Sequence, residues 1–379
     1  MKKLILFAAI LMMSNMLSAQ WIQMPNPYIG DNDSLRVIYF IDHEHGLIGG
    51  NAWGQGNLKL TMDAGYTWDD YTNWLFPISI SFPNANNGWL INDNNGQTII
   101  HYTLDGGFNQ NSWLVMDTLQ DVYYKRRIFF TDSLNGWFCG GIIGDLFSTG
   151  YAYSTSNGGI SWDQSFISSY FDTPLYDIYF INDSVGWTSG EWGTILHTTN
   201  KGESWVSQQL ENIYTFRSIQ FIDENIGWVA GEKTESGNKT GVIFKSANGG
   251  SDWELQLEYT IPPISDIAFT DSQNGWAVGD SGVILHTSNG GGTWEYQESG
   301  TIANLKSTCF IGDNYGWICG DSSIILYTDN GGTVGINKPS QTQNLVSIYP
   351  NPSNGIATIT FNLEKENDLE LIIQNFNGQ

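Results

Sequence analysis

Hydrophobic residues along the chain occur in short runs that are separated by turns rich in Gly, Asn, Asp, Ser and Thr. The run at 282–286, for example, leads directly into the turn TSNGGGTW at 287–294. Apolar runs of this length between clusters of turn residues predict β-strands. The pattern therefore predicts an all-β chain built from many short strands.

The turn at 287–294 belongs to a motif, here called the box, that occurs seven times. Each copy places Ser or Thr two residues before Asp or Asn, and five copies close on Trp. The hydroxyl and the Asp or Asn side chain can bond backbone N–H groups of a tight turn, and Gly supplies a positive φ. The Trp opens the next strand and anchors it in a core. The Asp or Asn stands at 63, 105, 157, 200, 248, 289 and 330.

A second motif repeats in step with the first. It is a strand ending in an aromatic residue, a polar turn, then Gly-Trp and a short strand ending in Gly, as in FTDSLNGWFCG at 130–140. The copy at 40–50 has Leu47 in place of Trp. A repeat of 40–50 residues with four short strands per unit is typical of a β-propeller, and seven copies predict seven blades.

The two ends of the repeat array complement each other. The last box, at 328–335, lacks its Trp and a following strand, whereas residues 20–24 have the Trp and the strand but no box. The N-terminal segment is expected to complete the last blade, because closing the ring removes exposed strand edges. The sequence thus predicts a seven-bladed propeller over residues 20–334, closed by an N-terminal strand.

The connections of the predicted blades fall on two faces. The boxes and the turns between the first and second strands share one face, here called the box face, and are regular in length. The remaining loops lie on the opposite face, here called the variable face, where the loops at 141–150 and 232–240 are the longest of their kind. Binding sites usually occupy variable loops on a rigid scaffold.

Charge and the N-terminus indicate the compartment. The 379-residue chain has a formal charge of −24 with only 15 Lys and Arg, which argues against nucleic-acid binding. Residues 1–19 have the basic start, the short apolar run and the small-residue cleavage site of a signal peptide. No other stretch is long enough for a transmembrane helix. The protein is expected to be secreted or to lie on the outer cell surface.

The C-terminal part differs from the repeats. Residues 335–344 form a polar linker. Residues 345–379 contain two or three strand patterns and a Pro-Asn-Pro turn, which predict a small β-sandwich, and the chain stops directly after an Asn-Gly turn signal. The tail is therefore expected to be a truncated domain.

Three cysteines are too few for a disulfide scaffold. If Phe310 pairs with Trp317 in the last blade, Cys309 and Cys319 point to opposite faces of the sheet. Free thiols are therefore expected.

Two family resemblances follow from these motifs. The paired repeats resemble photosystem II stability/assembly-factor propellers and the wider sialidase-type Asp-box (BNR) repeat proteins, which implies the fold over residues 20–334. The stretch SIYPNPSNGIATITF at 347–361 resembles the C-terminal sorting domain of the type IX secretion system. That resemblance implies export across an outer membrane, with the secretion machinery as a partner of residues 345–379. The last strands and terminal basic residues of that family are absent.

Four cations share one repeat position. Each stands four residues before the Phe that ends the first strand, in blades 1, 3, 5 and 7: Arg36, Arg126, Arg217 and Lys306. They are expected to form a ring at the mouth of the central channel on the variable face, where a ring of cations can hold a carboxylate or a sulfate. The alternative is that they pair with neighbouring acids or cover the barrel mouth.

Aromatic residues outside the repeats map to the same face. They are expected to stack on sugar rings or grip a peptide, and the alternative is that they cap the blades. The residues are Trp53, Trp74 and Trp192, joined by Tyr71, Tyr170 and Phe171.

An enzyme is the alternative interpretation. The sialidase resemblance implies three arginines and a Tyr–Glu pair; Arg36, Arg126 and Arg217 match in number, but no Tyr–Glu pair can be assigned. Xyloglucanases use two carboxylates across a cleft. Four acids follow the Gly that ends the second strand and are interpreted first as turn residues: Glu191, Glu232, Asp280 and Asp321.

The sequence thus favours an extracellular binding module with a glycan or a protein as ligand, docked on the variable face. A glycoside hydrolase of sialidase or xyloglucanase type remains the alternative. No catalytic residue, metal ligand or cofactor is expected.

Overall fold

The computed structural model describes residues 21–333 apart from 27–33, 52–57, 72–74, 95–96, 110–111, 120–124, 144–147, 166–172, 209 and 259–260, together with two strands at 346–349 and 358–361. Residues 19–333 form one compact unit. The predicted signal peptide and linker lie outside the described residues. No helix within these described ranges is long and apolar enough to cross a membrane.

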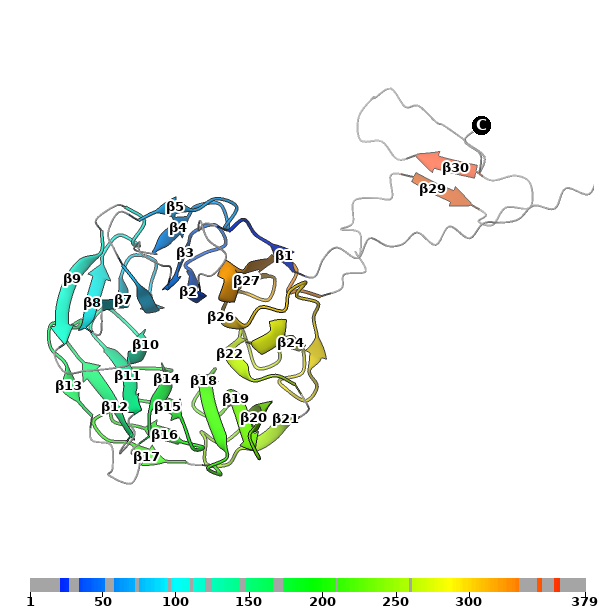
Figure 1. Ribbon diagram of the computed structural model, residues 1–379. Coiled ribbons are helices and arrows are strands. Elements are labelled where there is room, and N and C mark those ends of the chain that lie inside the picture. The colour runs from blue at the N-terminus through cyan, green and yellow to red at the C-terminus, as the bar shows by residue number, and fades with distance from the viewer. Residues whose placement is uncertain are drawn as a thin grey trace, which may run out of the picture. The chain divides into compact units, whose positions relative to one another are not determined.

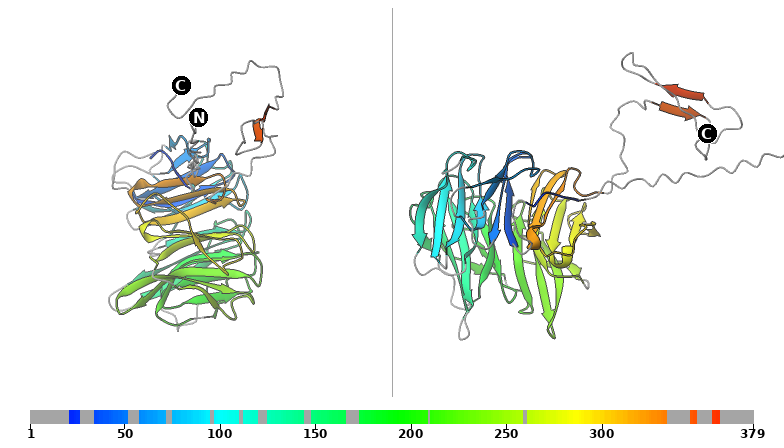
Figure 2. Two further views of the ribbon diagram at one scale, coloured as in Figure 1. Left: turned by 90° about the vertical axis from the view of Figure 1, so that its right-hand side faces the viewer. Right: turned by 45° about the horizontal axis from the view of Figure 1, so that its top comes forward.

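Seven antiparallel four-stranded sheets surround a central channel, and in each sheet the first strand is innermost (Figures 1 and 2). The predicted seven-bladed propeller is confirmed. Blades 1 to 3 contain β2 (Ser34–Phe40), β3 (Gly46–Asn51), β4 (Lys59–Thr61) and β5 (Asp69–Asp70); β6 (Pro77–Ser81), β7 (Gly88–Asn94), β8 (Gln97–Thr103) and β9 (Leu114–Leu119); and β10 (Lys125–Phe130), β11 (Gly136–Ile143), β12 (Ser148–Thr155) and β13 (Asp163–Gln164).

Blades 4 to 6 repeat this arrangement, and all three of their second-to-third strand connections are short turns. They contain β14 (Leu175–Phe180), β15 (Gly186–Gly190), β16 (Ile195–Thr198) and β17 (Val206–Ser207); β18 (Tyr214–Phe221), β19 (Gly227–Glu235), β20 (Asn238–Ser246) and β21 (Glu254–Glu258); and β22 (Ile264–Phe269), β23 (Gly275–Gly279), the 3-10 turn η1 (Asp280–Gly282), β24 (Ile284–Thr287) and β25 (Glu295–Tyr296).

Blade 7 is closed by the N-terminal strand, as predicted. Its strands are β26 (Leu305–Ile311), β27 (Tyr315–Gly320) and β28 (Ile325–Thr328), with η2 (Asp321–Ser323) between the last two, and β1 (Ile22–Gln23) pairs antiparallel with β28. Trp21 is only 4% exposed and donates its indole N–H to Gln297 Oε1 at 2.9 Å. The first described residues thus join the last blade through both backbone and side chain.

The boxes bond as the sequence predicts. In blade 6, the Thr287 hydroxyl accepts a hydrogen bond from Gly291 N at 2.9 Å, and Asn289 Oδ1 accepts one from Thr293 N at 2.9 Å. Gly290 has a φ of 68° and donates its N–H to Gln273 O in the turn between the first two strands, at 2.8 Å. Box and turn therefore share one face of the blade.

The second motif builds the seams between blades. In blade 3, the ring of Trp137 stacks on Phe180 of blade 4 with centroids 3.6 Å apart and planes at 11°, and its indole N–H donates to Lys201 O in the blade 4 box at 2.6 Å. A Cβ on Gly186, which precedes Trp187 in blade 4, would lie 2.5 Å from Phe180. The Gly thus makes room for the Phe ring that the preceding blade's Trp covers.

Six of the seven seams have this arrangement, with centroid distances of 3.5–3.9 Å. The seam between blades 1 and 2 differs because Leu47 replaces the Trp. There Tyr71 is buried, donates its hydroxyl to Asn109 O and accepts from Trp113 N, each at 3.0 Å. Tyr71, expected to be a variable-face aromatic, is instead part of a seam.

Each first strand contains a β-bulge, one residue that has no partner on the second strand. In blade 5, Phe216 pairs with Gly231 and Ser218 with Ala230, so Arg217 is the extra residue. A Cβ on Gly231 would lie 2.0 Å from Thr215 O, which explains the terminal Gly of the motif. The seven bulge residues are Arg36, Ile78, Arg126, Tyr176, Arg217, Ser265 and Lys306.

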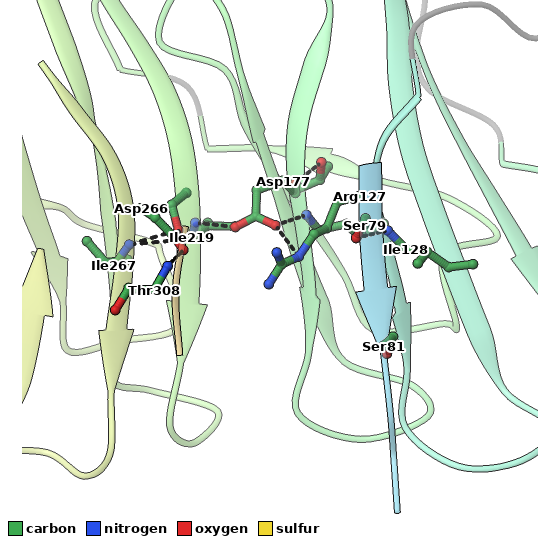
Figure 3. Close-up of polar contacts among 12 residues, drawn as sticks. Ser79, Ser81, Arg127, Ile128, Asp177, Ile219, Asp266, Ile267 and Thr308 are labelled. Atoms are coloured by element: carbon green, nitrogen blue, oxygen red, sulfur yellow. Dashed lines mark hydrogen bonds and ion pairs between the residues drawn. The ribbon is translucent and has the colours of Figure 1, made fainter. Parts of the chain in front are cut away.

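Side chains in the channel cap the inner edges of the first strands (Figure 3). Asp177 of blade 4 accepts the N–H of Ile219 in blade 5 at 2.8 Å, and Asp266 of blade 6 accepts that of Thr308 in blade 7 at 2.9 Å. Arg127 Nε lies 3.3 Å from Asp177 Oδ1. These bonds satisfy backbone groups that no neighbouring strand pairs.

Two expectations need correction. The segment 232–240 is not a loop, because β19 and β20 continue as a ladder to the pair Glu235–Asn238, with Ser236 and Gly237 at positive φ in the turn. Likewise, residues 141–143 and 148–150 of the expected loop 141–150 continue the ladder of β11 and β12. In blade 7 the register is shifted by one from the expected pairing, so that Cys309, not Phe310, pairs with Trp317. Cys309 and Cys319 therefore lie on the same face of the sheet, and both are nevertheless free thiols.

The C-terminal unit is described only by an antiparallel hairpin of β29 (Val346–Tyr349) and β30 (Thr358–Phe361). Two of the expected strands are present. The Pro-Asn-Pro turn and the rest of the expected sandwich lie outside the described residues.

The seam motif predicts graded losses of stability. Trp137→Phe keeps the ring stack but leaves Lys201 O without its donor, and it should lower the free energy of unfolding by about 1–3 kcal/mol. Trp137→Ala should lower it by about 3–5 kcal/mol. Urea unfolding of both variants, with the exposed Tyr296→Phe as control, measures this order; equal stability of Trp137→Phe and wild type would contradict it.

The buried carboxyl group of Asp266 leads us to expect that the free energy of unfolding depends on pH. Burial raises its pKa to about 6, although Arg127 lowers it. A pKa above the unfolded value means that the stabilisation is present at low pH and is lost as the pH rises through about 6. Asp266→Asn should therefore gain stability relative to wild type between pH 4 and 8, by on the order of 2–3 kcal/mol. The prediction would be refuted if the free energies of unfolding of the two proteins differed by the same amount at every pH in this range.

Candidate functional site

The bulge residues lie at the start of the innermost strands, on the variable face at the channel mouth. The four cations expected to form a ring occupy this position in blades 1, 3, 5 and 7. Equivalent backbone positions do not give them equivalent surroundings, however, because the residue across the ladder differs from blade to blade.

Arg217 is paired with an acid of its own blade. Its Nη2 donates to Glu232 Oε2 at 3.1 Å, and Lys239 Nζ donates to Glu232 Oε1 at 2.6 Å. The Glu232 side chain is 4% exposed. Burial alone would raise its pKa, but the hydrogen bond from Lys239 and the charge of Arg217 hold the pKa of Glu232 below its usual value. Glu232 is thus ionised and has a cation on each oxygen.

Lys306 is paired in the same way. Its ammonium bonds the Asp321 carboxylate and donates to Ser34 Oγ of blade 1 at 2.6 Å. Burial alone would raise the pKa of Asp321, but the bond and charge of Lys306 hold it below the usual value. In both blades the acid is the residue directly after the Gly that ends the second strand.

Arg36 and Arg126 lack this partner. The residues that follow the equivalent Gly in blades 1 and 3 are Asn51 and Gly141, which cannot form an ion pair. Both arginines are exposed. Their charge therefore faces the solvent at the mouth of the channel.

Arg126 and Arg217 flank Tyr176, the bulge residue of blade 4. Their guanidinium carbons lie 5.0 and 5.9 Å from the centroid of its ring. The Tyr176 hydroxyl donates to Glu191 Oε1 at 2.5 Å. Burial, then this bond to an acid, raises the pKa of Tyr176, so the phenol stays protonated at neutral pH.

A cleft of about 870 Å³ opens between blades 4 and 5 on the variable face. Here it is called the blade 4–5 cleft. It brings Trp192 and Arg217, both expected from the sequence to bind ligand, into one site. The other lining residues are Tyr176, Glu191, Asn212, Ile213, Thr215, Glu232, Thr234 and Lys239.

Trp192 has an unfavourable backbone conformation. It is 51% exposed and has a φ of 54°. The left-handed region costs a residue with a Cβ roughly 1–2 kcal/mol. Trp53 and Trp74, the other two tryptophans expected at this face, lie outside the described residues, as do Tyr170 and Phe171.

Two carboxylates, Glu191 and Glu232, line the blade 4–5 cleft, and the phenol of Tyr176 bonds one of them. A glycosidase needs one carboxyl group that is protonated and free to act as an acid. Glu232 does not meet this requirement, because its pKa is lowered and its two oxygens bind Arg217 and Lys239. Glu232 is therefore not available as a general acid.

The sequence analysis did not find Tyr176, Lys239 or the pairing of Tyr176 with Glu191. The signal was present in the repeat alignment: Tyr176 occupies the position of the four cations, and Glu191 occupies that of Glu232. The contact between the two positions depends on the bulge, which shifts the register by one residue.

The chain is similar to proteins of known structure and to one family. The profile of PSII_BNR, photosynthesis system II assembly factor YCF48, matches residues 110–265 and 255–337, more than half of the chain. YCF48 bound to D1 peptide has a TM-score of 0.59 at 19% identity, covering 81% of this chain and 95% of that one. YCF48 from Cyanidioschyzon merolae has a TM-score of 0.60 at 19% identity, covering 82% and 98%.

A third similar structure is the extracellular domain of a putative one-component system from B. thetaiotaomicron, with a TM-score of 0.57 at 12% identity, covering 81% of this chain and 40% of that one. At such identities the likeness concerns the fold. No curated protein sequence matches the chain.

The ion pair of Arg217 at the channel mouth predicts that this residue contributes more to stability than Arg126 does. Arg217→Ala should lower the free energy of unfolding by about 2 kcal/mol, less than the ~3–5 kcal/mol of a fully buried pair, because Arg217 is 37% exposed and Lys239 stays on Glu232. Arg126→Ala should change it by less than about 0.5 kcal/mol. Urea unfolding of the two variants measures the difference, and equal effects would contradict the assignment.

Proposed function

This chain belongs to the family of photosynthesis system II assembly factor YCF48, and we propose that it is a binding module that holds a peptide segment of a partner protein on its variable face. The observation that carries the proposal is the pair of exposed cations Arg36 and Arg126 at the channel mouth, for which no acid in the described part of the chain forms an ion pair. A peptide carboxylate is the ligand chemistry that such guanidinium groups favour.

The relative bound to D1 peptide supports a peptide ligand on this scaffold. The formal charge of −24 does not oppose an acidic segment at this place. Charges farther away than about 8–10 Å are screened at physiological salt, so the local groups decide. At the mouth these groups include three of the four arginines.

A glycoside hydrolase is the second candidate, and the hydrogen bond of Tyr176 to Glu191 between two guanidinium groups is the observation in its favour. It is the weaker candidate because the cleft offers no carboxyl group with a raised pKa beside that pair. Binding without catalysis is the function we propose.

We also propose that the protein acts outside the cell. The signal-peptide pattern of residues 1–19 and the sorting-domain resemblance of residues 345–379 support export, with the type IX secretion machinery as the partner of the tail. The propeller would then present its variable face to ligands at the outer surface or in the medium.

The proposal predicts which peptides bind and where. On an array of acidic, neutral and basic peptides, the full chain should bind acidic ones, and added salt should weaken the binding. The double variant Arg36→Ala/Arg126→Ala should bind them at least ~10-fold more weakly. Lys201→Ala, a charge change on the box face, serves as the matched control. Peptide binding that the double variant retains would refute the assignment of the surface.

A further inference from the structure

The turn that carries Trp192 has two internal counterparts. In blades 4, 6 and 7 the second and third strands are joined by the same short turn, closed by a bond from Thr194 N to Glu191 O, from Val283 N to Asp280 O, and from Ile324 N to Asp321 O, at 3.0, 3.3 and 3.2 Å. The second residue of each turn has a left-handed φ: Trp192 at 54°, Ser281 at 57° and Ser322 at 57°.

Blades 6 and 7 thus place Ser where blade 4 places Trp. A bulky aromatic residue is poorly suited to this backbone region, and half of the Trp192 side chain gains nothing from burial because it is exposed. The backbone conformation of this turn therefore favours Ser over Trp at position 192. The exposed half of the Trp192 side chain is available to a ligand in the cleft that it lines.

The charged groups of the blade 4–5 cleft balance, because two cations, Arg217 and Lys239, accompany two carboxylates, Glu191 and Glu232. Glu232 holds Arg217 and Lys239, and Glu191 holds the Tyr176 hydroxyl. A ligand carboxylate or ammonium would have to compete with these pairs, and Glu232 is too buried to be left without them. The cleft is therefore matched to a ligand without net charge.

The rest of the cleft lining is mostly polar, and Trp192 forms its exposed aromatic wall. Asn212, Thr215 and Thr234 add amide and hydroxyl groups to the lining, and Ile213 is the one aliphatic side chain. A pyranose ring has a C–H face that stacks on an aromatic ring and an edge of hydroxyls that bond such polar groups. An apolar peptide side chain would leave the polar groups unpaired.

We propose that the blade 4–5 cleft is a subsite for a neutral sugar, with Trp192 as the stacking platform and Glu191 and Asn212 as hydroxyl partners. Arg36 and Arg126 do not line this cleft, although the Arg126 guanidinium lies against its Tyr176 ring. A volume of about 870 Å³ admits more than one sugar unit, so an oligosaccharide is the ligand class.

The test uses the full chain and a panel of neutral oligosaccharides: cellohexaose, xylohexaose, mannohexaose and chitohexaose. Isothermal titration calorimetry should detect at least one of them with a Kd of millimolar or tighter. Trp192→Ser, the residue of the two sister turns, should weaken that binding ~10-fold or more. Because it relieves the strained backbone, it should also leave Tm unchanged or higher.

Two controls keep the outcomes distinct. Tyr296→Ser removes an exposed aromatic residue of blade 6 that does not line the cleft, and it should leave sugar binding unchanged. Arg36→Ala should weaken acidic peptides but not the sugar, because Arg36 contacts no described lining residue of the cleft, so failure of the peptide proposal does not affect this one. No binding of any of the four sugars by folded protein, or binding that Trp192→Ser retains, would overturn the proposal, as would a peptide that binds through Trp192 in place of sugar.

Discussion

The stacking of a Trp from one blade on a Phe from the next is the interaction on which the rest of the structure depends. A four-stranded blade cannot bury both faces alone, and six of the seven seams bury a ring pair at 3.5–3.9 Å with an indole N–H bonded to a box carbonyl. This contact needs the Gly beneath the Phe and the Gly turns of the box that supplies the carbonyl. Both motifs of the repeat are thus parts of one joint.

A joint made near the box face leaves the other end of the blade free to vary. The Phe that ends the first strand lies in the seam. The start of that strand forms only a bulge, which in blade 5 lies opposite Gly231. The bulge residue can therefore be Arg, Lys, Tyr, Ser or Ile without disturbing the seam. Function can be concentrated at this end because stability is supplied at the other.

The same division explains what could be predicted from the sequence. The blade number, the ring closure by Trp21 and the two faces follow from strict repetition, which the sequence displays directly. The neighbours of Tyr176 could not be predicted, because they depend on a one-residue register shift that leaves no mark in the periodicity. Likewise, segment 232–240 has the composition of a loop, yet its residues continue a ladder that begins in the blade.

The cations at the channel mouth differ in whether an acid of their own blade neutralises them. A bulge residue and the residue after the opposing Gly meet within one blade, so an acid at the second position neutralises a cation at the first. Glu232 and Asp321 do this for Arg217 and Lys306. Asn51 and Gly141 cannot do it for Arg36 and Arg126. Repeat position alone therefore identifies where a cation lies, and only the paired position tells whether its charge is available to a ligand. By the same rule Tyr176, a neutral donor, bonds Glu191 in blade 4 without cancelling the charge of that carboxylate, and in the blade 4–5 cleft this charge is balanced by Lys239, the second cation on Glu232.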